Sequence, residues 1–128
     1  MIKQLEEAAK RGDWDFVKNQ LPKVRSDETV ILWAAQEGIS HNNDNVIYLA
    51  ATLLERTNIP FSKLDGVKSS LYHLMKSYSG KVRYMAAFAL AAHDPKGYEA
   101  EVREVLCQAL EDGNPEFQER VKMHLIYN

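Results

Sequence analysis

The chain has little of what would place it in a specialised class of protein. It has one cysteine, so no internal disulfide can form and an oxidising compartment is not implied. Six glycines and four prolines in 128 residues are too few for collagen or a flexible linker. No apolar run approaches the roughly 18 residues that span a bilayer. The first sixteen residues also lack an apolar core of signal-peptide length, so we expect a soluble, cytoplasmic protein.

A strong excess of one charge is also absent. The formal net charge is −2, which by itself draws the chain neither to nucleic acid nor to anionic lipid. The charge is nevertheless segregated, because residues 56–96 hold seven Lys or Arg against two Asp or Glu, while the flanking parts are acidic. The central part suggests a possible basic band of Arg56, Lys63, Lys68, Lys76 and Lys81, with Arg83 beside it. Solvated lysines that only balance acidic neighbours are the alternative interpretation.

Alternating apolar and polar runs, the mark of strands, are absent as well. Apolar residues instead recur at spacings of three and four, which predicts helices along nearly the whole chain. We expect eight helices, over about 2–11, 13–21, 28–38, 45–57, 67–80, 81–93, 98–112 and from 115 onward. The apolar fraction of 45% and charged fraction of 27% fit one all-α globular domain over residues 1–128.

Local signals mark the ends of these helices. Gly12 followed by Asp13 predicts a helix end and the next N-cap, and Asn114 before Pro115 predicts another N-cap. Pro22 should stop the second helix, because proline removes a backbone donor. Ser62 with Asp65 resembles a capping box ahead of the fifth helix.

A repeat of about 35 residues underlies this series. The segment from Val46 to Leu54 aligns with 82–90 at an offset of 36, and 117–125 aligns with 82–90 at an offset of 35. Small residues in these blocks let helix axes approach closely, as stacked helix pairs require. The repeat therefore predicts neighbouring pairs of helices at 26–58, 62–94 and 98–128.

The block at 82–90, VRYMAAFAL, resembles the second helix of a HEAT repeat, whose pattern is V-R-x-x-A-A-x-A-L. Arg83 matches the arginine of that pattern, whereas Ile47 and Gln118 stand in its place in the other two units. Residues 1–25 resemble an ankyrin-type helix pair without the Thr-Pro-Leu-His segment, and we interpret them as a capping pair. The resemblance implies a short right-handed α-solenoid of about four stacked antiparallel helix pairs.

No pattern of catalytic residues emerges from the chain. The four histidines have no second His or Cys at metal-ligand spacing, and every glycine is isolated at the end of an element. The acidic residues between 99 and 112 fit a solvated helix face better than an acid–base pair. We therefore expect a protein that is not an enzyme and that needs no metal or cofactor.

What remains for function is the surface of the second helices. If Val82, Ala86 and Leu90 face the core, then the aromatic side chains Tyr84 and Phe88 face outward. They would form a binding stripe with the aligned residues of the neighbouring units. The candidate partner-binding residues are Tyr48, Thr52, Arg83, Tyr84, Phe88, Glu119 and Met123. The alternative is that the helix is rotated and these side chains pack against a neighbouring helix.

The function that these features favour is a non-catalytic protein–protein interaction module, a monomer that grips one partner on a concave helix surface. The resemblance to HEAT proteins implies scaffold or adaptor work, and so short a unit also suits an immunity or inhibitor protein that neutralises a bacterial toxin. The alternative is a HEAT-like nucleic-acid-binding protein that uses the basic band, although length and net charge argue against it. An accessory factor for an enzyme is a third hypothesis that no residue selects.

Overall fold

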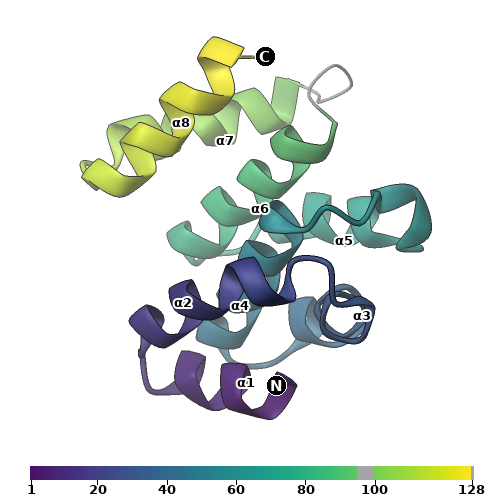
Figure 1. Cartoon of the computed structure of the whole chain (residues 1–128). Helices are drawn as coiled ribbons and strands as arrows, with labels where there is room; N and C mark the ends of the chain where they lie inside the picture. Colours follow the sequence, from purple (N-terminus) through teal and green to yellow (C-terminus); the bar gives the residue numbers. More distant parts are fainter. Residues whose placement is uncertain (95–99, 128) are drawn as a thin grey trace.

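The fold is known from a computed structural model, which describes residues 1–94 and 100–127, with side chains to 124. In these residues eight α-helices and two short 3₁₀ helices follow one another, and no strand forms (Figure 1). The helices are α1 (Ile2–Lys10), α2 (Trp14–Val24), α3 (Glu28–Gln36), α4 (Asp44–Arg56), α5 (Val67–Leu74), α6 (Gly80–His93), α7 (Ala100–Glu111) and α8 (Pro115–Tyr127), with η1 (Gly38–Ser40) and η2 (Phe61–Lys63) between them. The prediction of an all-α fold is confirmed.

Several helices begin at side-chain caps of the expected kind. The Asp13 carboxylate accepts a hydrogen bond from the Phe16 amide at 3.2 Å, and Asp27 accepts one from Val30 at the same distance. Asn114 accepts from the Glu116 amide at 2.9 Å, ahead of Pro115 at the first position of α8. These caps satisfy helix amides that have no partner within the helix, and they confirm the starts predicted at Asp13 and Asn114.

Two predicted helix ends and one predicted cap are wrong. Helix α2 continues through Pro22 to Val24, because a proline this close to the end, on the exposed side, removes only one hydrogen bond. The capping box does not open α5, since Gly66, in the left-handed conformation at φ 75°, caps that helix instead. Helix α5 ends at Leu74 rather than near Gly80, and Tyr78 is 92% exposed. The predicted start of α7 at Tyr98 lies outside the described residues.

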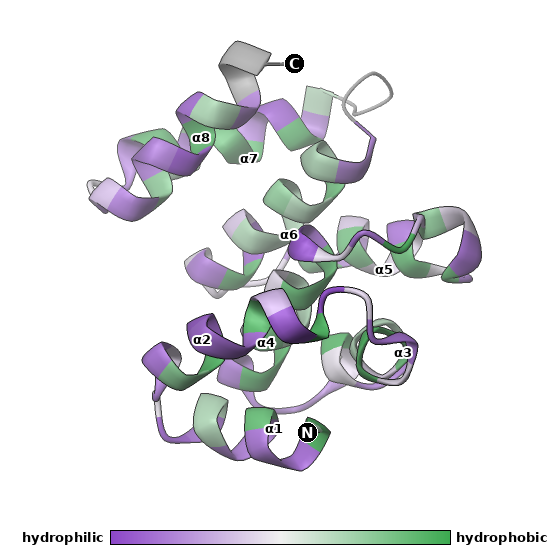
Figure 2. Ribbon diagram, in the orientation of Figure 1, coloured by the Kyte–Doolittle hydropathy of each residue, from purple (hydrophilic) through white to green (hydrophobic). Residues whose placement is uncertain are grey.

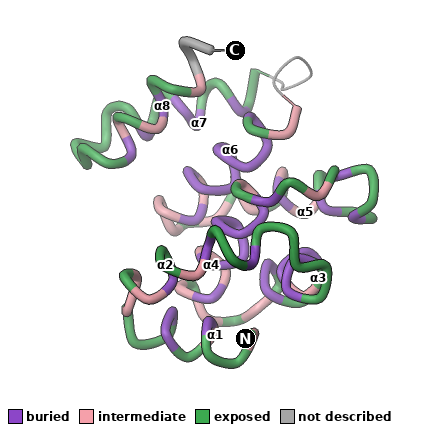
Figure 3. The backbone as a smooth tube through the Cα atoms, viewed as in Figure 1, coloured by how far each residue is buried: buried purple, intermediate pink, exposed green. Residues whose placement is uncertain are grey.

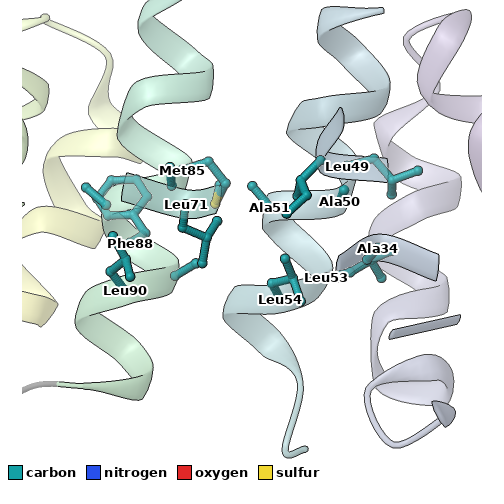
Figure 4. Close-up of a cluster of buried hydrophobic side chains, with 14 of the residues drawn as sticks. Ala34, Leu49, Ala50, Ala51, Leu53, Leu54, Leu71, Met85, Phe88 and Leu90 are labelled. Atoms are coloured by element: carbon teal, nitrogen blue, oxygen red, sulfur yellow. The ribbon is translucent and has the colours of Figure 1, made fainter. Parts of the chain in front are cut away.

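Helices α4 and α6 form the centre of the molecule. They make the most extensive contact of any two helices described, and α6 also packs against α5, α7 and α8. Figure 3 shows both helices largely buried, whereas the outer helices are exposed along much of their length. In Figure 4, Ala51 lies on the side of α4 that faces Leu71 and Met85 from the neighbouring helices. Small side chains at this contact let the two helix axes approach closely.

The remaining helices surround this centre. Helices α1 and α2 pack against one another and against α4, while α3 packs on α4 from another side. Helix α8 contacts both α7 and α6 (Figure 1). Helix α6 carries mostly apolar residues all round (Figure 2), which is typical of a helix enclosed by others. The first and last parts of the chain thus both reach the central helices.

Candidate functional site

The predicted binding stripe does not exist as an exposed surface on α6. Tyr84 is 5% exposed, and Phe88 and Ala91 are fully buried. The Phe117 ring lies over both aromatic residues, with ring centroids 5.5 Å from Tyr84 and 6.2 Å from Phe88. The expectation that these side chains face solvent is wrong, and the alternative of packing against a neighbouring helix describes them correctly.

The reason lies in the composition of α6 and in the position of α8. From Met85 to Ala91 every residue of α6 is apolar and buried, so this part of the helix has no polar face to offer to water. Helix α8 covers the side that the prediction left open, and its own Val121 is fully buried. The Tyr84 hydroxyl donates a hydrogen bond to the Asp112 carboxylate at 3.1 Å.

The other predicted binding residues separate into two groups. Tyr48, Thr52 and the 61% exposed Met123 line hollows between α2, α4 and α8. Arg83 lies elsewhere, in a cavity of about 770 Å³ between α5 and α7, and its guanidinium donates to the Ser77 carbonyl at 2.8 Å. Glu119 is exposed and lines neither. Tyr48, Thr52 and Met123 therefore mark the surface on which a site can be built.

Three cavities on that surface share lining residues, and we refer to them together as the α2–α8 groove. The inner cavity holds about 210 Å³ between α2, α4, α8 and the start of α6. It shares Lys18 and Arg56 with a middle cavity of about 660 Å³, and Arg56 also lines an end cavity of about 340 Å³. Together they provide a groove that side chains from the first and last helices complete.

The groove carries more positive than negative charge. Its cationic side chains are Lys18, Arg25, Arg56, Lys81 and Arg120, and its carboxylates are Glu55 and Glu116. Five cations against two carboxylates contrast with the net charge of −2 of the whole chain. Lys18 and Glu116 pair loosely across the opening, with Nζ and Oε1 3.8 Å apart and both side chains more than half exposed. The lining of the groove therefore has an excess of positive charge.

Glu55 pairs with the basic side chains on one side of the groove. Its side chain is 6% exposed, forms an ion pair with Arg120, and lies 3.2 Å from Arg56 Nε and 3.3 Å from His124 Nε2. Burial favours a raised pKa for this carboxyl, but the His124 hydrogen bond and the charges of Arg120 and Arg56 outweigh burial and lower the pKa. Glu55 therefore remains ionised and holds α8 against α4.

Two aromatic rings and a lysine line part of the inner cavity. The Trp14 and Tyr48 rings meet edge to face with centroids 5.1 Å apart. The Lys81 ammonium lies 5.5 Å from the Tyr48 ring centroid and 6.0 Å from that of Trp14, within the range of cation–π contacts. Burial raises the pKa of the Tyr48 hydroxyl, so this phenol stays neutral.

The possible basic band is not assembled as one surface. Arg56 and Lys81 line the α2–α8 groove, but Lys76 lines the cavity between α5 and α7. Lys63 is exposed on η2, and Lys68 pairs with Asp94 at 2.9 Å. The prediction grouped these residues by position in the chain, whereas the fold groups Arg56 and Lys81 with cations from α2 and α8.

Trp14, Lys18, Arg25, Glu55 and Arg120 were not among the predicted site residues. A signal existed for α2, because Trp14, Lys18 and Arg25 recur at helical spacing and so share one face. Arg120 offered no comparable signal, since its partner Glu55 lies 65 residues earlier in the chain. Only the tertiary fold, in which α8 packs on α6 beside α4, brings these two charges together.

The described residues contain no group of three or more His, Cys, Asp or Glu side chains arranged to hold a metal ion. Among the same residues, no helix has both the length and the apolar character that crossing a membrane requires. Comparison of the chain with protein-family models, with curated proteins and with solved structures finds no match.

Proposed function

We propose that this chain is a non-catalytic protein-interaction module that captures an acidic segment of a partner protein in the α2–α8 groove. The observation that carries the proposal is the groove itself, in which five cations and two carboxylates surround partly exposed aromatic rings. Aromatic and arginine side chains are the residue types that contribute most to protein interfaces. The charge imbalance favours negatively charged partners and speeds their association.

A protein partner fits this groove better than a nucleic acid. Nucleic-acid binding draws its affinity from many phosphate contacts along an extended cationic surface. Here the other candidate cations, Lys63, Lys68 and Lys76, lie away from the groove, and Glu116 stands at its opening. The groove therefore suits a short acidic segment, and binding of an oligonucleotide is the competing outcome of the test below.

The stacking of four helix pairs into a short right-handed HEAT-like solenoid belongs to the same proposal, as does a monomeric state. Its support is that α4 contacts α6 and α6 contacts α8, so helices at equivalent places in the repeat adjoin. Helices α3, α5 and α7 each pack on the helix that follows them in the chain. Light scattering of the purified chain should give the mass of one copy, near 14.6 kDa.

The test measures binding of three labelled probes by fluorescence anisotropy. They are an acidic Glu/Leu peptide, a basic Lys/Leu peptide of the same length, and a single-stranded oligonucleotide. We expect the acidic peptide to bind most tightly and to weaken as salt rises. Arg56→Glu should reduce its affinity by about tenfold or more, whereas Lys63→Glu, at an exposed position outside the groove, should have little effect.

The outcomes separate the hypotheses. Tighter binding of the oligonucleotide, with the same loss in Arg56→Glu, supports the nucleic-acid alternative. Equal loss in Arg56→Glu and Lys63→Glu, or no binding of the acidic peptide, contradicts the proposal. A toxin inhibitor is a narrower form of the same function, and it requires that the product of a neighbouring gene bind this groove and lose its activity on binding.

A further inference from the structure

The Lys81 ammonium occupies an unusual position in the inner cavity. It bonds to the Asn45 side-chain oxygen, and the Asn45 amide donates in turn to the Ala9 carbonyl at 3.0 Å. Tyr48 and Trp14 present ring surfaces to it. Across residues 1–94 and 100–127, Lys81 has no carboxylate partner, although the chain carries 18 Asp and Glu.

The fold thus holds a partly buried cation in place without neutralising it. An ammonium group has three donors, and the bond to Asn45 uses one of them. Anchoring of Asn45 to α1 orients Lys81 before any ligand arrives, which lowers the entropy cost of binding. The unused donors can therefore serve an anionic group that enters the cavity.

The remaining walls indicate which anion fits. Three other cations line the cavity, but Arg56 and Arg120 both pair with Glu55, and Lys18 pairs with Glu116 at the opening. A group with a single negative charge suits this balance better than a dianion. The Trp14, Tyr48 and Phe117 side chains supply apolar contact for a short hydrocarbon stem, and the volume of about 210 Å³ suits one side chain.

We infer that the inner cavity of the α2–α8 groove binds one carboxylate of the partner, with Lys81 as its main contact and the Trp14 and Tyr48 rings against its stem. This inference rests on the proposed function, because it names the group that anchors an acidic segment in the groove. A glutamate side chain and the carboxylate at a chain terminus are the two sources of such a group. A phosphate in the same place is an alternative that the experiment must be able to reveal.

The experiment uses the full chain labelled with ¹⁵N, in which the two tryptophan indole signals are resolved and assigned through Trp33→Phe. Sodium propionate, methylphosphonate and chloride are titrated at constant ionic strength. We expect propionate to shift the Trp14 indole signal saturably and to leave that of Trp33 unchanged. Lys81→Met, which keeps the stem over the rings, should weaken propionate binding about tenfold or more. Lys81→Arg should restore part of it, and Lys76→Met, outside the groove, should behave as wild type.

The inference is overturned if the Trp14 signal does not saturate, if Lys81→Met binds propionate as wild type does, or if methylphosphonate binds more tightly. Two peptides then distinguish the sources, one with an internal glutamate and an amidated end, the other with a free end and no glutamate. An acidic peptide that binds Lys81→Met and wild type equally removes this inference but leaves the proposed function intact. Absence of acidic-peptide binding to wild type removes the proposed function as well.

Discussion

Helices α4 and α6 have aligned sequences but different surroundings on one face. Tyr48, Thr52 and Glu55 of α4 correspond to Tyr84, Phe88 and Ala91 of α6. On α4 these positions line the groove or point towards it, and they include a hydroxyl and a carboxylate. On α6 the same positions are buried, two of them under the aromatic ring of Phe117.

The difference shows that a helix face becomes a site or part of the core according to what covers it. Helix α8 packs directly on α6 but reaches α4 mainly through its charged side chains Arg120 and His124. Where packing is direct, the face is apolar; where it is not, the face keeps polar groups and an open groove. Replacing equivalent residues on the two helices should therefore have unequal effects.

The largest effect is expected at the buried face of α6. Phe88→Ala removes a fully buried ring that contacts Phe117 and His124, and should lower the free energy of unfolding by about 3–5 kcal/mol. Thr52→Ala, at the corresponding position of α4, removes only the hydrogen bond that the Thr52 hydroxyl donates to the Tyr48 carbonyl. It should lower the free energy of unfolding by about 1 kcal/mol. Urea unfolding of both variants measures the difference, and equal losses would contradict this prediction.

Removing Glu55 should have the next largest effect. Glu55→Ala leaves the 13% exposed Arg120 without its buried partner and should cost about 3 kcal/mol. Glu116→Ala, which breaks an exposed pair, should cost less than about 1 kcal/mol.

The effect of Glu55 also depends on pH in a defined direction. Because folding lowers the pKa of this carboxyl below 4.5, its stabilisation is complete above that pH and is lost as pH falls through the lower folded value. The stability of wild type and Glu55→Ala should therefore converge in acid. A constant difference from pH 7 to pH 2 would contradict the role assigned to the ionised carboxylate.

The side of α4 away from the groove is enclosed as tightly as α6. A Cβ atom added at Gly38 would lie 2.7 Å from the Ala50 Cβ and 3.2 Å from the Trp33 ring. Gly38→Ala should therefore cost about 1–3 kcal/mol through overpacking. Adding Ala50→Gly to it should recover part of the loss, and additive losses in a double-mutant cycle would argue against this contact.

The smallest effect is expected at the C-terminal end of α6. His93 stacks on Phe61 with ring centroids 4.0 Å apart, and none of the described residues forms a hydrogen bond with its buried Nε2. Burial lowers the pKa of His93 below 6.5, so the unfolded chain takes up the proton first and stability falls as pH drops below that value. His93→Gln should flatten this decline in thermal melts between pH 7 and pH 5. His73→Gln, at an exposed position, controls for loss of an imidazole.

The sequence predicted the all-α class and most helix starts because these depend on local patterns. Asp13 and Asn114 act as caps within three residues, and the spacing of apolar residues is local as well. The continuation of α2 through Pro22 and the cap at Gly66 were missed because proline and glycine permit more than one local outcome, and packing decides between them.

The candidate site was predictable only in part. Tyr48, Thr52, Arg56 and Lys81 were named in advance and line the groove. The misassignment of Phe88 came from treating the repeat as an open stack, although the unbroken apolar run from Met85 to Ala91 already indicated an enclosed helix. Contacts such as Glu55 with Arg120 join residues far apart in the chain, and no short-range pattern encodes them.

The walls of the groove come from both ends of the chain, since α2 supplies Trp14 and Lys18 while α8 supplies Glu116 and Arg120. A molecule bound there would contact both α2 and α8, and would thus hold the first and last quarters of the polypeptide together. Occupancy would then raise the melting temperature of the entire domain and slow amide exchange at both extremities together. If the proposed function holds, partner binding and the stability of the domain are thermodynamically linked.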